Sequence, residues 1–83
     1  MVYVLETQQL SRISSRFETY DTQIFSSAKK AAFEIEQAIE INKGYEVEKR
    51  VNSPTEYYIT YKIMTDSGRP FTNRYRVRKM EVK

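Results

Sequence analysis

From Tyr45 onward the chain alternates apolar and polar residues, and this period of two limits what it can form. Alternating runs span 45–51, 57–63 and 74–78. Successive side chains of a strand point to opposite faces, so each run presents one apolar and one polar face. Turn residues separate the runs, at Asn52-Ser53-Pro54 and at Asp66-Ser67-Gly68-Arg69-Pro70. The second half of the chain therefore predicts three antiparallel strands with one face packed.

A single helix is indicated over roughly 27–42. Ser26 or Ser27 offers an N-cap oxygen, and Gly44 can take the left-handed conformation that closes a helix. Six apolar residues then fall within about 120° of arc. They are Ala28, Ala31, Ala32, Ile35, Ala38 and Ile39. This stripe predicts that the helix lies across one face of the sheet, close to it.

The first 25 residues predict two further strands. Val2 to Leu5 are apolar on both faces, which is typical of a strand that is covered on both sides or central in the sheet. Glu18–Ile24 is rich in β-forming residues and should pair with it. The polar stretch Gln8–Arg16 is either a long loop or a loosely paired continuation of the first strand. The predicted fold, over the single domain 1–83, is α+β in the order ββαβββ, with one helix packed on one face of an antiparallel sheet of four to five strands.

The last alternating run carries three arginines on one face. Arg74, Arg76 and Arg78 would project side by side, about 7 Å apart. With Lys62 and Tyr58 they would form a cationic face with a ring for stacking, suited to phosphates or to carboxylates of a protein. Alternatively, they are charged residues on the wet face of an edge strand, where they deter aggregation. The use of Arg rather than Lys favours a contact role.

Two other features leave alternatives open. Met80 and Val82 share the parity of the arginines, so either a bulge lies near Arg78-Lys79 or the outer face becomes apolar there. Phe33 lies opposite the apolar stripe of the helix, among charged residues. It is either part of a partner surface or is covered by Gln8–Arg16 folding over the helix.

The composition argues against catalysis. The chain has 83 residues with no His and no Cys, so the usual general base and the best nucleophile are both missing. Two glycines cannot build a glycine-rich phosphate loop, and no Asp-rich loop suits a cation. We therefore expect a protein that is not an enzyme, with no catalytic residue, no cofactor and no metal site.

Charge and hydropathy limit the classes of partner that the chain can have. Residues 1–44 carry five Lys/Arg against six Asp/Glu, and residues 45–83 carry nine against five, which together give the net charge of +3. This excess permits nucleic-acid binding without requiring it. No apolar run is long enough to cross a membrane, and the start lacks the basic region of a signal peptide. We expect a cytoplasmic protein, monomer or homodimer, with a protein partner first, nucleic acid second and no membrane.

The first 40 residues or so also carry a resemblance. Val2-Tyr3-Val4-Leu5, a polar excursion and Ile24-Phe25-Ser26-Ser27 leading into a helix are similar to the start of many small uncharacterised phage and mobile-element accessory proteins. The resemblance brings no activity and no site residues. It implies a context of compact proteins without enzymatic activity, some of which inhibit host defence systems, CRISPR effectors included.

These observations predict a non-enzymatic binding protein, a phage or mobile-element inhibitor that docks on a host protein. In a phage-encoded inhibitor, binding would take place in the host cytoplasm. The alternative is a small nucleic-acid-binding module using the basic face. The predicted partner-binding residues are Arg74, Arg76, Arg78, Lys62, Tyr58 and Phe33.

Overall fold

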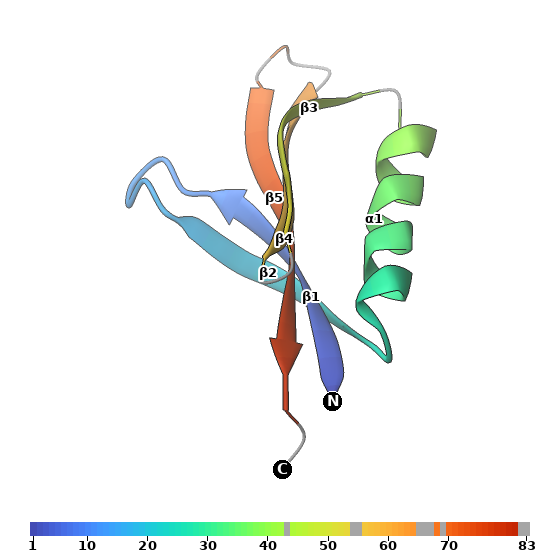
Figure 1. Ribbon diagram of the computed structural model, residues 1–83. Coiled ribbons are helices and arrows are strands. Elements are labelled where there is room, and N and C mark those ends of the chain that lie inside the picture. The colour runs from blue at the N-terminus through green and yellow to red at the C-terminus, as the bar shows by residue number, and fades with distance from the viewer. Residues whose placement is uncertain (43, 54–55, 65–67, 69, 82–83) are drawn as a thin grey trace.

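The computed structural model describes residues 1–42, 44–53, 56–64, 68 and 70–81 (Figure 1). Its elements follow the order ββαβββ, which confirms the predicted order and the α+β class. They are β1 (Val2–Leu10), β2 (Phe17–Phe25), α1 (Ala28–Ile41), β3 (Tyr45–Asn52), β4 (Tyr57–Met64) and β5 (Pro70–Met80). All five strands join one antiparallel sheet.

The sheet has the strand order β2-β1-β5-β4-β3, so the last strand of the chain is the central one. β5 pairs with β4 along one side and with β1 along the other, where Val4 lies opposite Arg78. Reading the arginines as residues of an edge strand was therefore wrong. The edges are β2 and β3, and the first and last strands lie side by side at the middle of the sheet (Figure 1).

β1 is longer than the sequence predicted. It continues through Gln8 to Leu10, so the loosely paired continuation holds for the first part of Gln8–Arg16 and a loop for the rest. An irregularity between Thr7 and Gln8 shifts the register against β2. The loop closes through hydrogen bonds, with Ser11 N–H donating to the Arg16 carbonyl at 2.8 Å.

Local hydrogen bonds set both ends of α1. Ser27 is the N-cap, and its hydroxyl accepts from the Lys30 N–H at 3.2 Å, as one of the two predicted serines should. At the other end, the Asn42 backbone N–H and side-chain amide both donate to the Ala38 carbonyl, at 3.2 and 2.8 Å. Asn42 has an extended conformation and is the C-cap of this helix.

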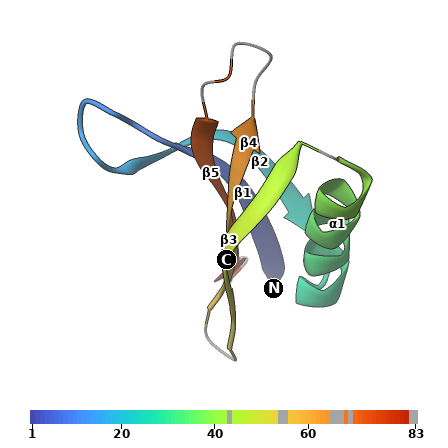
Figure 2. The same cartoon turned by 90° about the horizontal axis from the view of Figure 1, so that it is seen from above.

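The core lies between α1 and the sheet. Ile35 of the helix packs with Leu5 and Ile59 of the sheet, and Ala31 is completely buried, which allows a close approach. Partly buried side chains surround this cluster: Phe25, Ile39, Tyr57, Tyr75 and Val77. The helix contacts β1, β2 and β5 and lies along one side of the sheet (Figure 2). Most of the predicted stripe is therefore covered, although Ala28, in the first turn, is exposed.

Three tyrosine rings pack against one another across neighbouring strands on the helix side of the sheet. The ring centroids of Tyr45 and Tyr61 are 4.8 Å apart, and those of Tyr61 and Tyr75 are 4.7 Å apart. Burial raises the pKa of Tyr61 to about 12 and also raises that of Tyr75. These rings form part of the packing layer, as the parity of Tyr61 and Tyr75 with the apolar residues predicts.

The end of β5 shows on which face of the sheet Met80 lies. The register between β1 and β5 runs without a shift from Gln9 to Val2, so the predicted bulge near Arg78-Lys79 is wrong. Instead, Met80 stays on the arginine face and is 44% exposed. This is the other alternative, in which the outer face becomes apolar at the end of the strand. Other predicted features lie outside the described residues: Val82, Pro54 and most of the turn at 66–70. In that turn Gly68 is described, with a φ of 77° that favours glycine.

Candidate binding surfaces

The three arginines lie on the face of the sheet that is turned away from α1. We call this face the open face. Two of them have carboxylate partners. Arg78 Nε lies 2.6 Å from Glu6 Oε1, and Arg76 Nη2 lies 4.0 Å from Glu56 Oε1. The predicted Lys62 is also paired, since its Nζ lies 3.5 Å from Glu48 Oε1. Three cations of this face, Lys62, Arg76 and Arg78, are therefore compensated by carboxylates of the chain itself.

Arg74 has a different environment. Its guanidinium carbon lies 4.1 Å from the ring centroid of Phe17 and 5.5 Å from that of Tyr58. Its Nε donates a hydrogen bond to Gln8 Oε1 at 2.7 Å. Burial, followed by repulsion from Arg76, lowers the pKa of Arg74. The guanidinium is thus flanked by two aromatic rings and held at one edge.

A polar network under the arginines holds these positions. Gln8 is only 5% exposed, and its amide nitrogen donates to Thr19 Oγ1 at 3.1 Å. Thr19 in turn donates to Glu6 Oε2 at 2.9 Å. Glu6 Oε1 accepts no aligned hydrogen bond and is compensated only by the ion pair with Arg78. The network joins Arg74 to Arg78 through side chains of β1 and β2, of which Gln8 is buried.

Phe33 lies on the other side of the molecule, on the outer surface of α1, and is 64% exposed. The loop after β1 projects away from α1 in two perpendicular views (Figures 1 and 2). Its Ile13 is 99% exposed and covers nothing. The alternative in which Gln8–Arg16 covers Phe33 is therefore wrong, and Phe33 is exposed.

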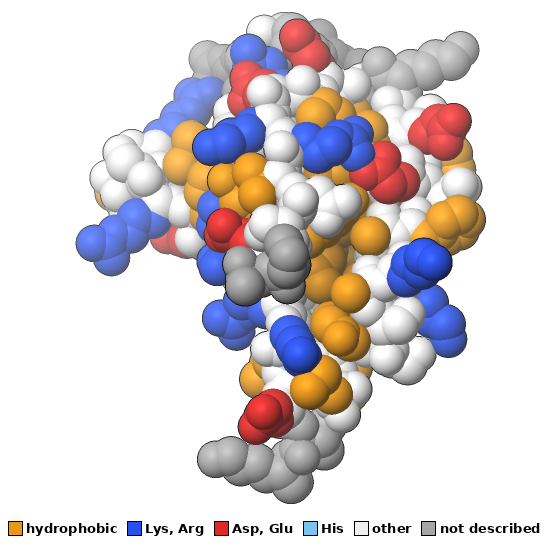
Figure 3. Space-filling view, viewed as in Figure 1, with side chains coloured by type: hydrophobic (Ala, Val, Ile, Leu, Met, Phe, Trp, Pro, Cys, Tyr) orange, Lys and Arg blue, Asp and Glu red, His pale blue; other side chains and the backbone are white. Residues whose placement is uncertain are grey.

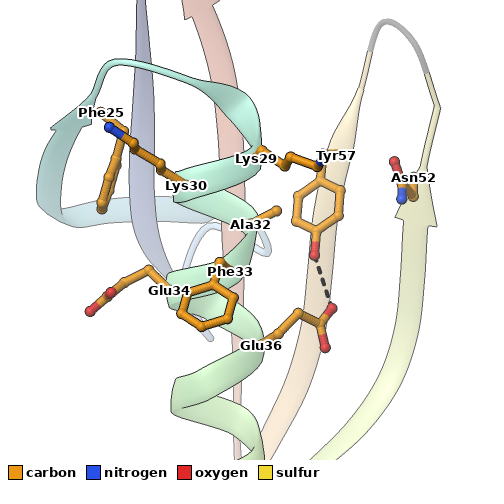
Figure 4. Close-up of a pocket in the computed structure, with 9 residues that line it drawn as sticks. All are labelled: Phe25, Lys29, Lys30, Ala32, Phe33, Glu34, Glu36, Asn52 and Tyr57. Carbon is orange, nitrogen blue, oxygen red and sulfur yellow. Dashed lines mark hydrogen bonds between the residues drawn. The ribbon is translucent and has the colours of Figure 1, made fainter.

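A hollow of about 750 Å³ lies beside Phe33 (Figure 4). Its lining is mostly apolar, with Lys29 and Lys30 among the polar members. The remaining lining residues are Phe25, Ala32, Phe33, Glu34, Glu36, Asn52 and Tyr57. We call this region, Phe33 included, the helix-side hollow.

A helix-to-sheet contact forms one wall of the helix-side hollow. Tyr57 of β4 donates its hydroxyl to Glu36 Oε1 at 3.0 Å, and Arg50 of β3 pairs with the same carboxylate. Burial and the Glu36 hydrogen bond raise the pKa of Tyr57 to about 12. These contacts hold the wall to the sheet, whereas the Phe33 ring in the same lining is exposed.

The six predicted partner-binding residues fall into two groups. Tyr58, Lys62 and the three arginines share the open face, as their parity predicts, whereas Phe33 lies on the helix side. The sequence did not indicate the roles of Phe17 of β2 and Gln8 of β1, because only the pairing of β1 with β2 and β5 brings them to Arg74. Basic side chains are scattered among acidic and uncharged ones in the view of Figure 3 and do not form a single patch.

Comparisons with known proteins add no relative. No protein-family model matches the chain, and neither the curated proteins nor the solved structures contain a significant match. Within the described ranges, no helix is long and apolar enough to cross a membrane. The same part of the chain contains no group of three acidic, His or Cys side chains placed to hold a metal ion.

Proposed function

We propose that this chain is a non-enzymatic protein-binding domain that docks through the helix-side hollow. The observation that carries the proposal is Phe33, a large aromatic ring that is 64% exposed beside an apolar depression. Aromatic anchors next to pockets supply most of the binding energy at protein interfaces.

The charged side chains around the hollow indicate which charges a partner should carry at the rim of its own surface. Neither Lys29 nor Lys30 forms an ion pair with any residue in the described part of the chain, and Lys30 donates only to Ser26 Oγ at 3.1 Å. Glu34, which also lines the hollow, has no ion pair among the described residues either, whereas Glu36 is paired with Arg50. A partner that inserts an apolar side chain beside Phe33 would therefore gain from carboxylates facing the two lysines and from a cation facing Glu34. The resemblance of the N-terminal region supports a host defence protein, such as a CRISPR effector, as the partner of a phage or mobile-element inhibitor.

Nucleic-acid binding is the weaker candidate because the open face is internally paired. Three of its four predicted cations lie within 4.0 Å of a carboxylate. A phosphate contact at any of these three would require displacing its carboxylate, which offsets the gain from counterion release. Fluorescence-anisotropy titrations with single- and double-stranded probes at two salt concentrations should show only binding weaker than about 10⁻⁴ M at physiological salt.

The docking proposal is tested by affinity capture from nuclease-treated lysate of the bacterial host. Wild-type bait should retain a protein that Phe33→Ala bait loses. Ile41→Ala is the matched control, because Ile41 is 72% exposed on the same helix but does not line the hollow. Arg74→Glu with Arg76→Glu tests the open face in the same experiment. If the double reversal abolishes capture and Phe33→Ala does not, the partner docks on the open face and the proposal is wrong.

A further inference from the structure

Arg74 differs from the other arginines of the open face because no acidic side chain lies within ion-pair distance of it in the described part of the chain. Its Nε is used by Gln8, and its terminal Nη groups have no hydrogen-bond partner among the same residues. The neighbourhood is partly dehydrated and also contains Arg76, which together lower the pKa of Arg74. An anion placed at the Nη edge would offset both effects through charge attraction and hydrogen bonds.

The guanidinium is also held in place before any ligand arrives. The rings of Phe17 and Tyr58 flank it, and the buried Gln8 amide fixes its Nε edge. Gln8 is oriented by its own hydrogen bond to Thr19, so its oxygen faces Arg74. A side chain already fixed in this way loses little conformational entropy on binding.

We propose that Arg74 is the anchor of a second recognition site, which binds a carboxylate side chain of an acidic peptide segment. With Nε occupied, the two Nη groups present a forked edge that matches the two oxygens of a carboxylate. Phe17 and Tyr58 beside it would contact the methylene groups of an Asp or Glu side chain. This site is independent of the helix-side hollow, since the two lie on opposite sides of the sheet.

The surroundings favour a carboxylate over a nucleic-acid phosphate. Glu56 and Glu6 compensate the neighbouring arginines, so the described cations of this face that keep no carboxylate partner are Arg74 and Lys49, whose Nζ lies 5.9 Å from the Tyr58 ring centroid. A nucleic-acid backbone places successive phosphates along a strand and would meet these carboxylates. A single acidic side chain needs only the one forked edge.

The direct test uses hexaglutamate as the probe and the side-chain Nε–Hε resonances of the ¹⁵N-labelled wild-type protein. The Arg74 resonance should shift saturably while that of Arg78, paired with Glu6, stays in place. No shift at Arg74, or equal shifts at both arginines, would overturn the proposal. Because this measurement uses the unmodified chain, it does not depend on how any variant folds.

Charge-preserving variants separate forked recognition from plain attraction. Arg74→Lys should weaken hexaglutamate binding about tenfold or more, because a lysine ammonium cannot bind bidentately. Arg78→Lys, the matched control, should change it less than about twofold. Equal losses in both variants would refute the site. If hexathymidylate binds through Arg74 more tightly than hexaglutamate does, the ligand of the site is a phosphate. That result would overturn the proposal of an acidic peptide. Phe33→Ala should leave hexaglutamate binding unchanged, which keeps this test separate from docking at the hollow.

Discussion

Removing the Phe33 ring should cost little stability, and the cost can be worked from its exposure. The residue is 64% exposed, so roughly a third of a side chain of about 200 Å² is covered, or about 70 Å². At about 25 cal/mol per Å², this gives an upper limit of about 1.8 kcal/mol. Alanine is the better helix former by about 0.5 kcal/mol, which offsets part of the loss. Phe33→Ala should therefore lower the free energy of unfolding by about 1 kcal/mol.

Ile35→Ala is the matched comparison, two residues further along the same helix. Ile35 is 1% exposed and belongs to the core cluster, so its truncation should cost about 2–5 kcal/mol. Urea denaturation followed by far-ultraviolet circular dichroism measures both variants against the wild type. The slope of free energy against urea should not change, so that a shift of the midpoint reports stability alone.

A loss of about 3 kcal/mol or more for Phe33→Ala would refute the reasoning, because that is the cost of a buried phenylalanine. It would mean that something covers the ring in solution. Repeating the measurement at several protein concentrations identifies the cover. A cost that grows with concentration would indicate that a second copy of the chain buries Phe33.

Three further predictions concern local interactions. Ser27→Ala removes the hydroxyl that caps α1 and should cost about 1 kcal/mol in the same urea assay, whereas Ser27→Asp should not. Gly68→Ala should cost about 1 kcal/mol through its φ of 77° alone, since an added Cβ meets nothing within 4 Å; an unchanged urea midpoint would contradict this. Tyr57 ionises near 10 when unfolded and near 12 when folded, so stability present below pH 10 is lost as the pH rises toward 12. Tyr57→Phe should reduce the loss measured between pH 8 and pH 11, and an equal loss in both proteins would contradict the assignment.

The sequence by itself determined the elements and their faces. Alternation over 57–63 and 74–78 predicts strands, since a period of two leaves one face apolar whatever the strand pairs with. The alanine-rich stripe predicts the helix, and the pair Ser26 and Ser27 predicts its start, for equally local reasons. For the same reason the shared face of Arg74, Arg76 and Arg78 was predictable.

The binding sites themselves could be predicted only in part. Exposure of Phe33 follows from its angle on the helix, but whether Gln8–Arg16 covers it depends on where β1 ends. The end of β1 is set by its pairing with β2 and β5, which involves residues far apart in the chain. No local pattern contains that information, so both alternatives remained open until the fold was known.

Only the tertiary structure decided how the arginines are used. Placing β5 between β1 and β4 brings Glu6 under Arg78, and Phe17 and Gln8 against Arg74. These partners come from the other end of the chain, and a shift of one residue in the register would turn each of them to the opposite face. The sequence shows which side chains are charged. The strand order determines which of those charges are neutralised, because ion pairing depends on distances of a few ångströms across strands that the sequence separates.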